Sequence, residues 1–312
     1  METNEILITP IFLVGARRSG TTLFRVMLNE HPKISWDRGW EFAVNFIDGN
    51  GRVLKNANTA KTEKSNPSSM EDLRAYLNNK AHMALGKKEI LGVTVHVGFK
   101  KIPHLYKNAK YIHIIRDPRD IAISSVKLGW SASYYYAPDL WITAEKEWEA
   151  LKAVIDKDAW IELRYENFVT QPELELQRIC AFIGVNYMEI FINCVNPTKY
   201  TCPNPSFTFR WKKQLEKYDV QLIESRIGNF LHQKEYQASP YPLLKISRIK
   251  AFELKIRNFA GIKSWGIAEE GFFLYFVGFL GRKLRLRSLM SVHKTKLQKI
   301  KQKQLENLEK NY

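Results

Sequence analysis

The sequence predicts an α/β fold in which a parallel β-sheet is flanked by helices and is followed by a basic helical C-terminal extension. Short, nearly continuous apolar runs alternate with stretches of helical spacing, the pattern of strands that are buried on both faces of a sheet. The excess of positive charge lies toward the C-terminus. The predicted strands are residues 11–14, 90–97, 111–115 and 160–163.

Helical spacing of apolar residues occupies segments between these strands. It predicts helices at residues 21–29, 121–128 and 144–155. The polar segment 49–69 is rich in Asn, Lys and Ser and predicts a long loop, which in an α/β domain often covers a site. A second loop is expected at 196–205, which carries three prolines.

Charge divides the chain into two parts. The 312 residues include 48 Lys+Arg and 32 Asp+Glu, a net charge of +16, while 45% hydrophobic residues argue against a disordered or fibrous protein. Residues 243–312 hold 16 Lys and Arg against 5 Asp and Glu, a net charge of +11, which leaves +5 for residues 1–242. We therefore predict one domain at 1–242 and the basic helical extension at 243–312.

The cysteines and the apolar segments indicate in which cellular compartment we expect the protein. Cys180, Cys194 and Cys202 are too few and too scattered for a disulfide framework or a metal site, which favours a reducing compartment. The N-terminus has no basic region before its apolar stretch, and the apolar run 272–280 is much shorter than the roughly 20 residues that span a bilayer. We expect a cytoplasmic protein that is soluble or at most peripheral to a membrane.

A candidate phosphate-binding loop follows the first predicted strand. Residues 15–22 read GARRSGTT, so that Gly15 and Gly20 bound the loop with the spacing of a P-loop. Glycines let several backbone N–H groups point at one anion beside a helix N-terminus. An NTPase would have a lysine after the second glycine, but here the cations lie inside the loop as Arg17 and Arg18. The plainer alternative is a glycine turn with its arginines in solvent.

A second candidate phosphate site lies at the end of strand 111–115. Arg116 ends the strand, Asp117 suits a helix N-cap and Pro118 suits the first helical position. Ser124 lies about two turns farther along the same face of that helix. Arg116 and Ser124 could therefore bind one phosphate. The alternative is a structural ion pair of Arg116 with Asp117 or Asp120.

Together these motifs resemble those of sulfotransferases that use 3′-phosphoadenosine 5′-phosphosulfate. GARRSGTTLFRVMLNEHP (15–32) is similar to the family's 5′-phosphosulfate loop, and YIHIIRDPRDIAISS (111–125) is similar to its 3′-phosphate motif. Residues 161–168 resemble the strand that ends in a tyrosine near the nucleotide, here Tyr165, and 176–185 resemble the helix after it. Trp211 and Lys212 resemble a late Trp-Lys segment more loosely. The resemblance covers roughly residues 8 to 235.

The resemblance implies the roles of the site residues. The donor would be 3′-phosphoadenosine 5′-phosphosulfate, with no metal ion, and Arg18 would stabilise charge on the leaving group. For the general base it offers two candidates, Glu41 after His31-Pro32 and His96 at the end of a predicted strand. The residues expected to bind the nucleotide are Arg17, Arg18, Ser19, Gly20, Thr21, Thr22, Arg116, Ser124 and Tyr165.

The acceptor and the partner of the extension stay open at this point. We expect an acceptor with a hydroxyl group, with carbohydrate, glycolipid, small phenol and peptide tyrosine as candidates. Residues 281–312 hold ten Lys and Arg against two Glu, and they could form a solvated helix packed on the domain, a contact with a membrane or a glycan, or a nucleic-acid contact. No module that reads specific nucleic acid is visible. The alternative functions are a P-loop nucleotide kinase or NTPase, and a non-enzymatic protein that binds polyanions or membranes.

Overall fold

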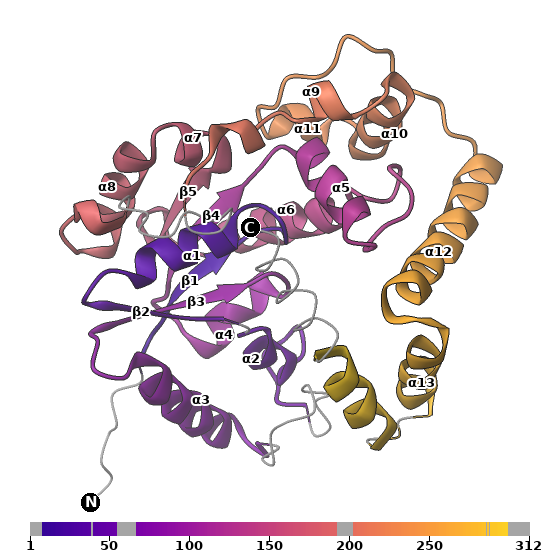
Figure 1. The fold of residues 1–312 in the computed structure, drawn as a ribbon. Coiled ribbons are helices and arrows are strands. Elements are labelled where there is room, and N and C mark those ends of the chain that lie inside the picture. The colour runs from indigo at the N-terminus through magenta and orange to yellow at the C-terminus, as the bar shows by residue number, and fades with distance from the viewer. Residues whose placement is uncertain are drawn as a thin grey trace, which may run out of the picture.

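A five-stranded parallel sheet forms the centre of the molecule (Figure 1). The computed structural model describes residues 8–38, 40–54, 67–191, 202–284, 286 and 288–298. The strand order is β2-β3-β1-β4-β5, and each neighbouring pair is parallel. The strands are β1 Ile11–Val14, β2 Ile34–Arg38, β3 Ile90–Val95, β4 Lys110–Ile115 and β5 Trp160–Arg164. The predicted α/β fold is confirmed.

Helices surround the sheet and continue beyond it along the chain. Those that precede β5 are α1 Thr21–Asn29, α2 Glu41–Asn45, α3 Met70–Leu85, α4 Ile102–Leu105, α5 Pro118–Lys127 and α6 Asp139–Lys152. After β5 come α7 Tyr165–Thr170, α8 Pro172–Ile183, α9 Trp211–Gln214, α10 Lys217–Ile227 and α11 Phe230–Gln233. The extension contains α12 Arg248–Glu270 and α13 Phe272–Lys283.

Strand β2 was not among the predicted strands. Its sequence, ISWDR, is short and half polar, because this strand lies at the edge of the sheet and pairs only with β3. Ile34 and Trp36 are its buried residues. The Trp36 ring lies against Gly92 of β3, where a Cβ atom would come within 2.3 Å of the indole. Only that neighbouring glycine gives the tryptophan room, so the strand depends on a contact that its own sequence does not show.

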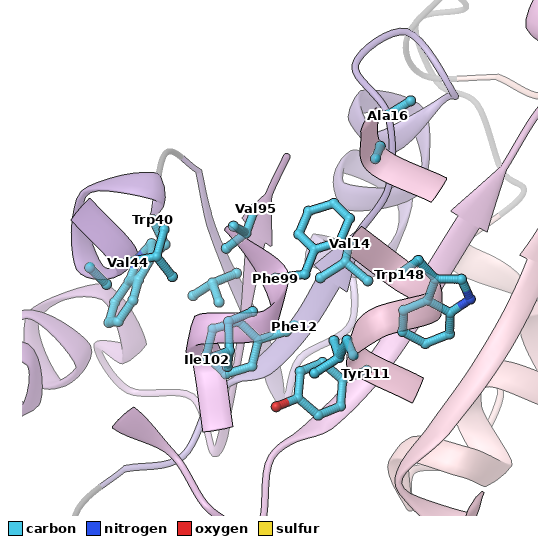
Figure 2. Close-up of a cluster of buried hydrophobic side chains, with 14 of the residues drawn as sticks. Phe12, Val14, Ala16, Trp40, Val44, Val95, Phe99, Ile102, Tyr111 and Trp148 are labelled. Atoms are coloured by element: carbon cyan, nitrogen blue, oxygen red, sulfur yellow. The ribbon is translucent and has the colours of Figure 1, made fainter. Parts of the chain in front are cut away.

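Both faces of the sheet are buried, as the apolar strands predict. In β1, Phe12 and Val14 point into a core that α3, α4 and α6 help to form, and Figure 2 shows them beside Tyr111 and Trp148. Ile11 and Leu13, which alternate with them, enter a second core that contains residues of α1 and α8. This alternation fixes the register of the central strand, because a shift by one residue would exchange the two faces.

Some expectations fall outside the described residues or need correction. The loop at 49–69 is described only at 49–54 and 67–69, and the loop at 196–205 only from Cys202. Cys180 is a buried free thiol, but Cys202 is disulfide-bonded. The disulfide at Cys202 removes the support for a reducing compartment, because disulfides persist under oxidising conditions.

The extension is helical through α12 and α13, and its last residues, 299–312, lie outside the description. Ser247 is the N-cap of α12 and accepts a hydrogen bond from the Lys250 backbone N–H at 3.1 Å. Within the described ranges, no helix has both the length and the hydrophobicity to cross a bilayer. The boundary at 242/243 stays a prediction.

A buried charge cluster lies under β4. His113 Nε2 lies 3.1 Å from Glu145 and its Nδ1 lies 3.0 Å from Glu162, while its ring stacks on Trp148. Lys234 pairs with Glu145 at 2.7 Å. Burial lowers the pKa of His113, but the two carboxylates outweigh that effect and the net pKa is raised. Both ring nitrogens can then donate, so we expect a buried imidazolium.

This cluster makes stability depend on pH. Because the folded pKa of His113 is raised above its unfolded value of 6.5, its stabilisation is complete below pH 6.5 and is lost as pH rises through the folded pKa. We expect the unfolding free energy to fall above pH 6.5 by up to about 1.4 kcal/mol per pH unit. Urea unfolding of the wild type and of His113→Gln, at about pH 6 and at about pH 8.5, on either side of the ordinary histidine pKa, measures this slope.

The matched control is His82→Gln, which changes an exposed histidine of α3. It should keep the slope of the wild type. An equal slope for His113→Gln and the wild type would show that His113 is not charged in the folded protein.

Candidate active site

A cavity of about 650 Å³ opens at the carboxyl ends of β1, β3 and β4. This is the edge at which open parallel sheets bind ligands. Among the residues that line the cavity are the following predicted ones: Arg17, Arg18, Gly20, Thr21, Thr22, Glu41, His96, Arg116, Ser124 and Tyr165. The structure thus brings together residues from six segments of the chain.

The loop between β1 and α1 needs glycine at both ends. A Cβ atom at Gly15 would come within 2.4 Å of the Ile114 carbonyl oxygen, and one at Gly20 within 2.3 Å of the Tyr165 ring. Gly20 also has a φ of 105° and caps α1 without a side-chain hydrogen bond. The first N–H groups of α1 are therefore turned to the cavity without a side-chain cap, which suits an anion.

Ser19 braces this loop. Its side chain is buried, and its hydroxyl donates to the Ala16 carbonyl at 2.7 Å. The predicted contact of Ser19 with a nucleotide stays a prediction, because here the hydroxyl serves the backbone of the loop itself. Sequence spacing places Ser19 in the motif but does not reveal which way its side chain turns.

Arg18 joins the two candidate phosphate motifs. Its Nε donates to Ser124 Oγ at 2.9 Å, and its guanidinium lies 5.8 Å from the centre of the Trp130 ring. The backbone of Arg18 has a φ of 74°, a left-handed conformation that costs energy for a residue with a side chain. These contacts hold the guanidinium at the cavity wall despite that strain.

Arg116 is held on several sides. Its guanidinium stacks on the Tyr165 ring at 4.1 Å, and it donates to the carbonyl oxygens of Arg18 at 3.1 Å and Phe207 at 2.6 Å. Asp120 lies 3.8 Å away, so the structural ion pair considered above also forms in part. Ser124 bonds Arg18 rather than Arg116. Both groups of the predicted phosphate pair still line the cavity.

Arg210 is a site residue that sequence reasoning missed. It lines the cavity, and its pKa is lowered first by burial and then by the positive charges of Arg116 and Arg18. Its Nε and that of Arg116 are buried and have no hydrogen-bond partner in the described part of the chain. The Trp-Lys pair at 211–212, next to Arg210, was the available signal. Lys127, Trp130 and Phe207 also line the cavity.

A buried ion cluster positions the segment that carries Arg210. Arg119 pairs with Asp117 and Glu224, at 2.7 Å each, and lies 3.7 Å over the Trp211 ring. The Trp211 indole N–H donates to Asp117 at 3.1 Å, and its backbone N–H donates to Asp120 at 3.0 Å. The N-terminus of α9 is thereby fixed to α5, with Arg210 facing the cavity.

Both candidate bases lie at this cavity. His96 follows β3 directly, and its Nδ1 lies 3.0 Å from the Gly15 carbonyl oxygen. Because a carbonyl oxygen only accepts, Nδ1 carries the hydrogen and Nε2 keeps its lone pair. Burial lowers the pKa of His96, and Glu41 opposes this shift. Glu41 begins α2 and pairs with Arg17 at 3.6 Å.

The extension helps to build one wall of the cavity. Asn258 Oδ1 of α12 accepts hydrogen bonds from the Ser131 hydroxyl at 2.8 Å and from the backbone N–H groups of Ala132 at 2.7 Å and Ser133 at 3.0 Å. These residues directly follow Trp130, which faces Arg18. Residues of α12 therefore hold the loop that carries an aromatic wall of the site.

No group of three or more His, Cys, Asp or Glu side chains in the described ranges is placed to hold a metal ion. That the reaction needs no metal stays a prediction.

Close packing of Gly20 against Tyr165 gives a test of the loop. Gly20→Ala adds a left-handed alanine and a clash with the Tyr165 ring, so we expect it to lower the unfolding free energy by more than the about 1–2 kcal/mol that the conformation alone costs. Gly184→Ala is the matched control, because Gly184 has a φ of 93° and no atom within 4 Å of the added Cβ. Urea unfolding of the two variants measures the difference. Equal losses of unfolding free energy in the two variants would show that the Tyr165 ring moves aside without an energetic cost.

Comparison with known proteins shows to which family the sequence is similar. The model of the sulfotransferase family matches residues 10–189. A Caenorhabditis briggsae protein that carries the name of a protein-tyrosine sulfotransferase is 24% identical in an alignment over 200 residues that covers 57% of this chain and 66% of that protein. This chain thus spans slightly less than two thirds of that relative.

A solved structure agrees on the fold. The sulfotransferase domain of the olefin synthase from Synechococcus PCC 7002 superposes with a TM-score of 0.50 at 20% identity, covering 72% of this chain and 97% of that domain. The family model covers more than half of the chain and includes both arginine motifs. The chain therefore belongs to the sulfotransferase family of enzymes.

Proposed function

We propose that this sulfotransferase moves a sulfuryl group from 3′-phosphoadenosine 5′-phosphosulfate to an acceptor hydroxyl. The observation that carries the proposal is the convergence of four arginines on one cavity, which are Arg17, Arg18, Arg116 and Arg210. A bisphosphate with a sulfate needs several cations, and arginine binds such oxyanions with paired N–H groups. The buried Nε atoms of Arg116 and Arg210, which have no hydrogen-bond partner among the described residues, could donate to an anionic ligand.

The residues divide between the two ends of the nucleotide. The N-terminus of α1, with Thr21 and Thr22, would hold the 5′-phosphosulfate through backbone and hydroxyl donors. Arg116 and Arg210 would hold the 3′-phosphate. Ser124 accepts from Arg18, so its own hydroxyl hydrogen is available for a phosphate oxygen.

Proton transfer and charge stabilisation complete the proposed mechanism. When bound, the donor supplies the sulfuryl group, and transfer to the acceptor oxygen leaves adenosine 3′,5′-bisphosphate. Arg18 would stabilise negative charge on the leaving group, since positioning and electrostatics dominate such transfers. His96 would take the acceptor's hydroxyl proton on Nε2. Glu41, which is tied to Arg17, is the alternative base.

For the acceptor we propose a hydroxyl on a ring compound or a tyrosine. Trp130 and Phe207 line the cavity, and aromatic faces pack well against sugar and phenol rings. The name of the nematode relative indicates tyrosine for that protein. A panel of a tyrosine peptide, a phenol, a glycan and a glycolipid with sulfur-labelled donor identifies the class.

Nucleotide binding tests the donor. Adenosine 3′,5′-bisphosphate without magnesium should raise the melting temperature, while ATP with magnesium should not. Arg116→Ala and Arg210→Ala should each weaken this binding by about tenfold or more, because each removes charged hydrogen bonds. Arg257→Ala, which removes an arginine whose side chain is 70% exposed, is the control and should bind as the wild type does. Stabilisation by ATP with magnesium, but not by adenosine 3′,5′-bisphosphate, would favour a kinase or NTPase.

The pH dependence of turnover tests the base. Because burial lowers the pKa of His96 below 6.5, kcat/KM should fall toward acid pH with a midpoint below 6.5. His96→Ala should lower kcat by about 10²–10⁴-fold and remove this acid limb, with the thermal shift by the bisphosphate retained. If Glu41→Gln shows that loss and His96→Ala does not, Glu41 is the base. Full turnover in both variants would exclude both residues.

A further inference from the structure

We propose that the outward face of α12 binds the surface of an anionic lipid membrane. This inference does not depend on the proposed donor or acceptor. Its starting point is that α12 has two opposite faces. Leu254, Asn258, Gly261 and Trp265 recur every three or four residues, and each lies against the body of the protein. A Cβ atom at Gly261 would come within 2.3 Å of Ala132, and a Cβ atom at Gly129 would come within 2.1 Å of the Trp265 ring.

The opposite face of α12 carries an apolar stripe, which we call the outer stripe. It consists of Ile249, Phe252, Ile256 and Phe259, whose spacing of three, four and three residues places them in one line. They are 84%, 64%, 54% and 61% exposed. Two phenylalanines and two isoleucines in one exposed line are far more apolar than a solvated helix requires.

Exposed aromatic residues continue into α13. Phe272 and Phe273, which begin that helix, are 69% and 71% exposed, and Phe276 stacks on Phe272 with ring centres 6.1 Å apart. Figure 1 shows α12 along one side of the molecule, away from the sheet, with α13 at its C-terminal end. The extension therefore offers apolar side chains from both of these helices.

The charge on these helices favours lipid over another protein chain. Together α12 and α13 hold seven Lys and Arg against three Glu. Glu253 is neutralised by Lys250 at 3.0 Å and Arg257 at 2.7 Å. Lys263 lies 4.1 Å over the Phe259 ring at the end of the outer stripe. Exposed apolar residues beside surplus lysine and arginine are typical of helices that lie in the interface of an anionic bilayer. A second copy would bring the same positive charge and be repelled.

The inner face of α12 and the outer stripe do not overlap. The inner face holds the loop at 130–133, which includes the cavity residue Trp130, and the outer stripe lies on the other side of the same helix. One helix diameter, about 10 Å, separates them. Membrane binding through the outer stripe would therefore leave the cavity uncovered.

Vesicle flotation tests the proposal with the full chain. We expect the protein to float with vesicles of about 30% phosphatidylserine in phosphatidylcholine, and to bind pure phosphatidylcholine and high-salt samples much more weakly. Phe252→Ser combined with Phe259→Ser should weaken binding by about tenfold or more. Met83→Ser combined with Leu174→Ser removes two exposed apolar residues from α3 and α8 and should bind as the wild type does.

Melting curves and light scattering make the result decisive. Because the substituted residues are exposed, both double variants should keep the melting temperature and the monomer mass of the wild type. Absence of flotation with the anionic vesicles would overturn the proposal, as would equal flotation of the two double variants or equal binding to both vesicle types. A wild-type dimer that the outer-stripe variant dissociates, without vesicle binding, would instead identify the stripe as a self-association surface.

Discussion

The site depends on one stack of groups at the carboxyl edge of the sheet. The backbone of Gly20 lies against the Tyr165 ring, and the guanidinium of Arg116 lies 4.1 Å over that ring. Arg116 in turn donates to the Arg18 carbonyl in the glycine loop. This stack ties the ends of β1, β4 and β5 together. Both candidate phosphate motifs take their relative positions from it.

Two arginines of one motif have different roles because their charge partners differ. Arg119 is buried and is satisfied by Asp117 and Glu224, with which it forms hydrogen bonds of 2.7 Å. Burying a charge is tolerable when such partners are present, so Arg119 is a structural group. Arg116, three residues earlier, keeps a buried Nε without a partner in the described part of the chain. The structural cluster thus leaves Arg116 and Arg210 available for a ligand.

The extension contacts the loop at the site and also presents an exposed apolar face. The sequence singled out residues 281–312 as a basic helical segment and did not single out α12. In the structure α12 has an inner face, which holds the loop at 130–133 through Asn258, and the outer stripe. A helix with two apolar faces gives a weak amphipathic signal, because the two stripes cancel around the helix axis. The periodicity of the sequence alone therefore did not reveal the two faces of α12.

The sequence by itself predicted four of the five strands, both motifs and the family. Strand β1 and helix α1 lie where apolar spacing predicted them, since periodicity and glycine spacing are local properties. Only the tertiary structure decided the edge strand β2, the inward turn of Ser19, the place of Arg210 and the tautomer of His96. Each of these rests on a contact between distant segments. Arg18 and Ser124, for example, are 106 residues apart, and His96 and Gly15 are 81 apart. Such hydrogen bonds form only when folding brings the strand ends together, so local sequence does not record them.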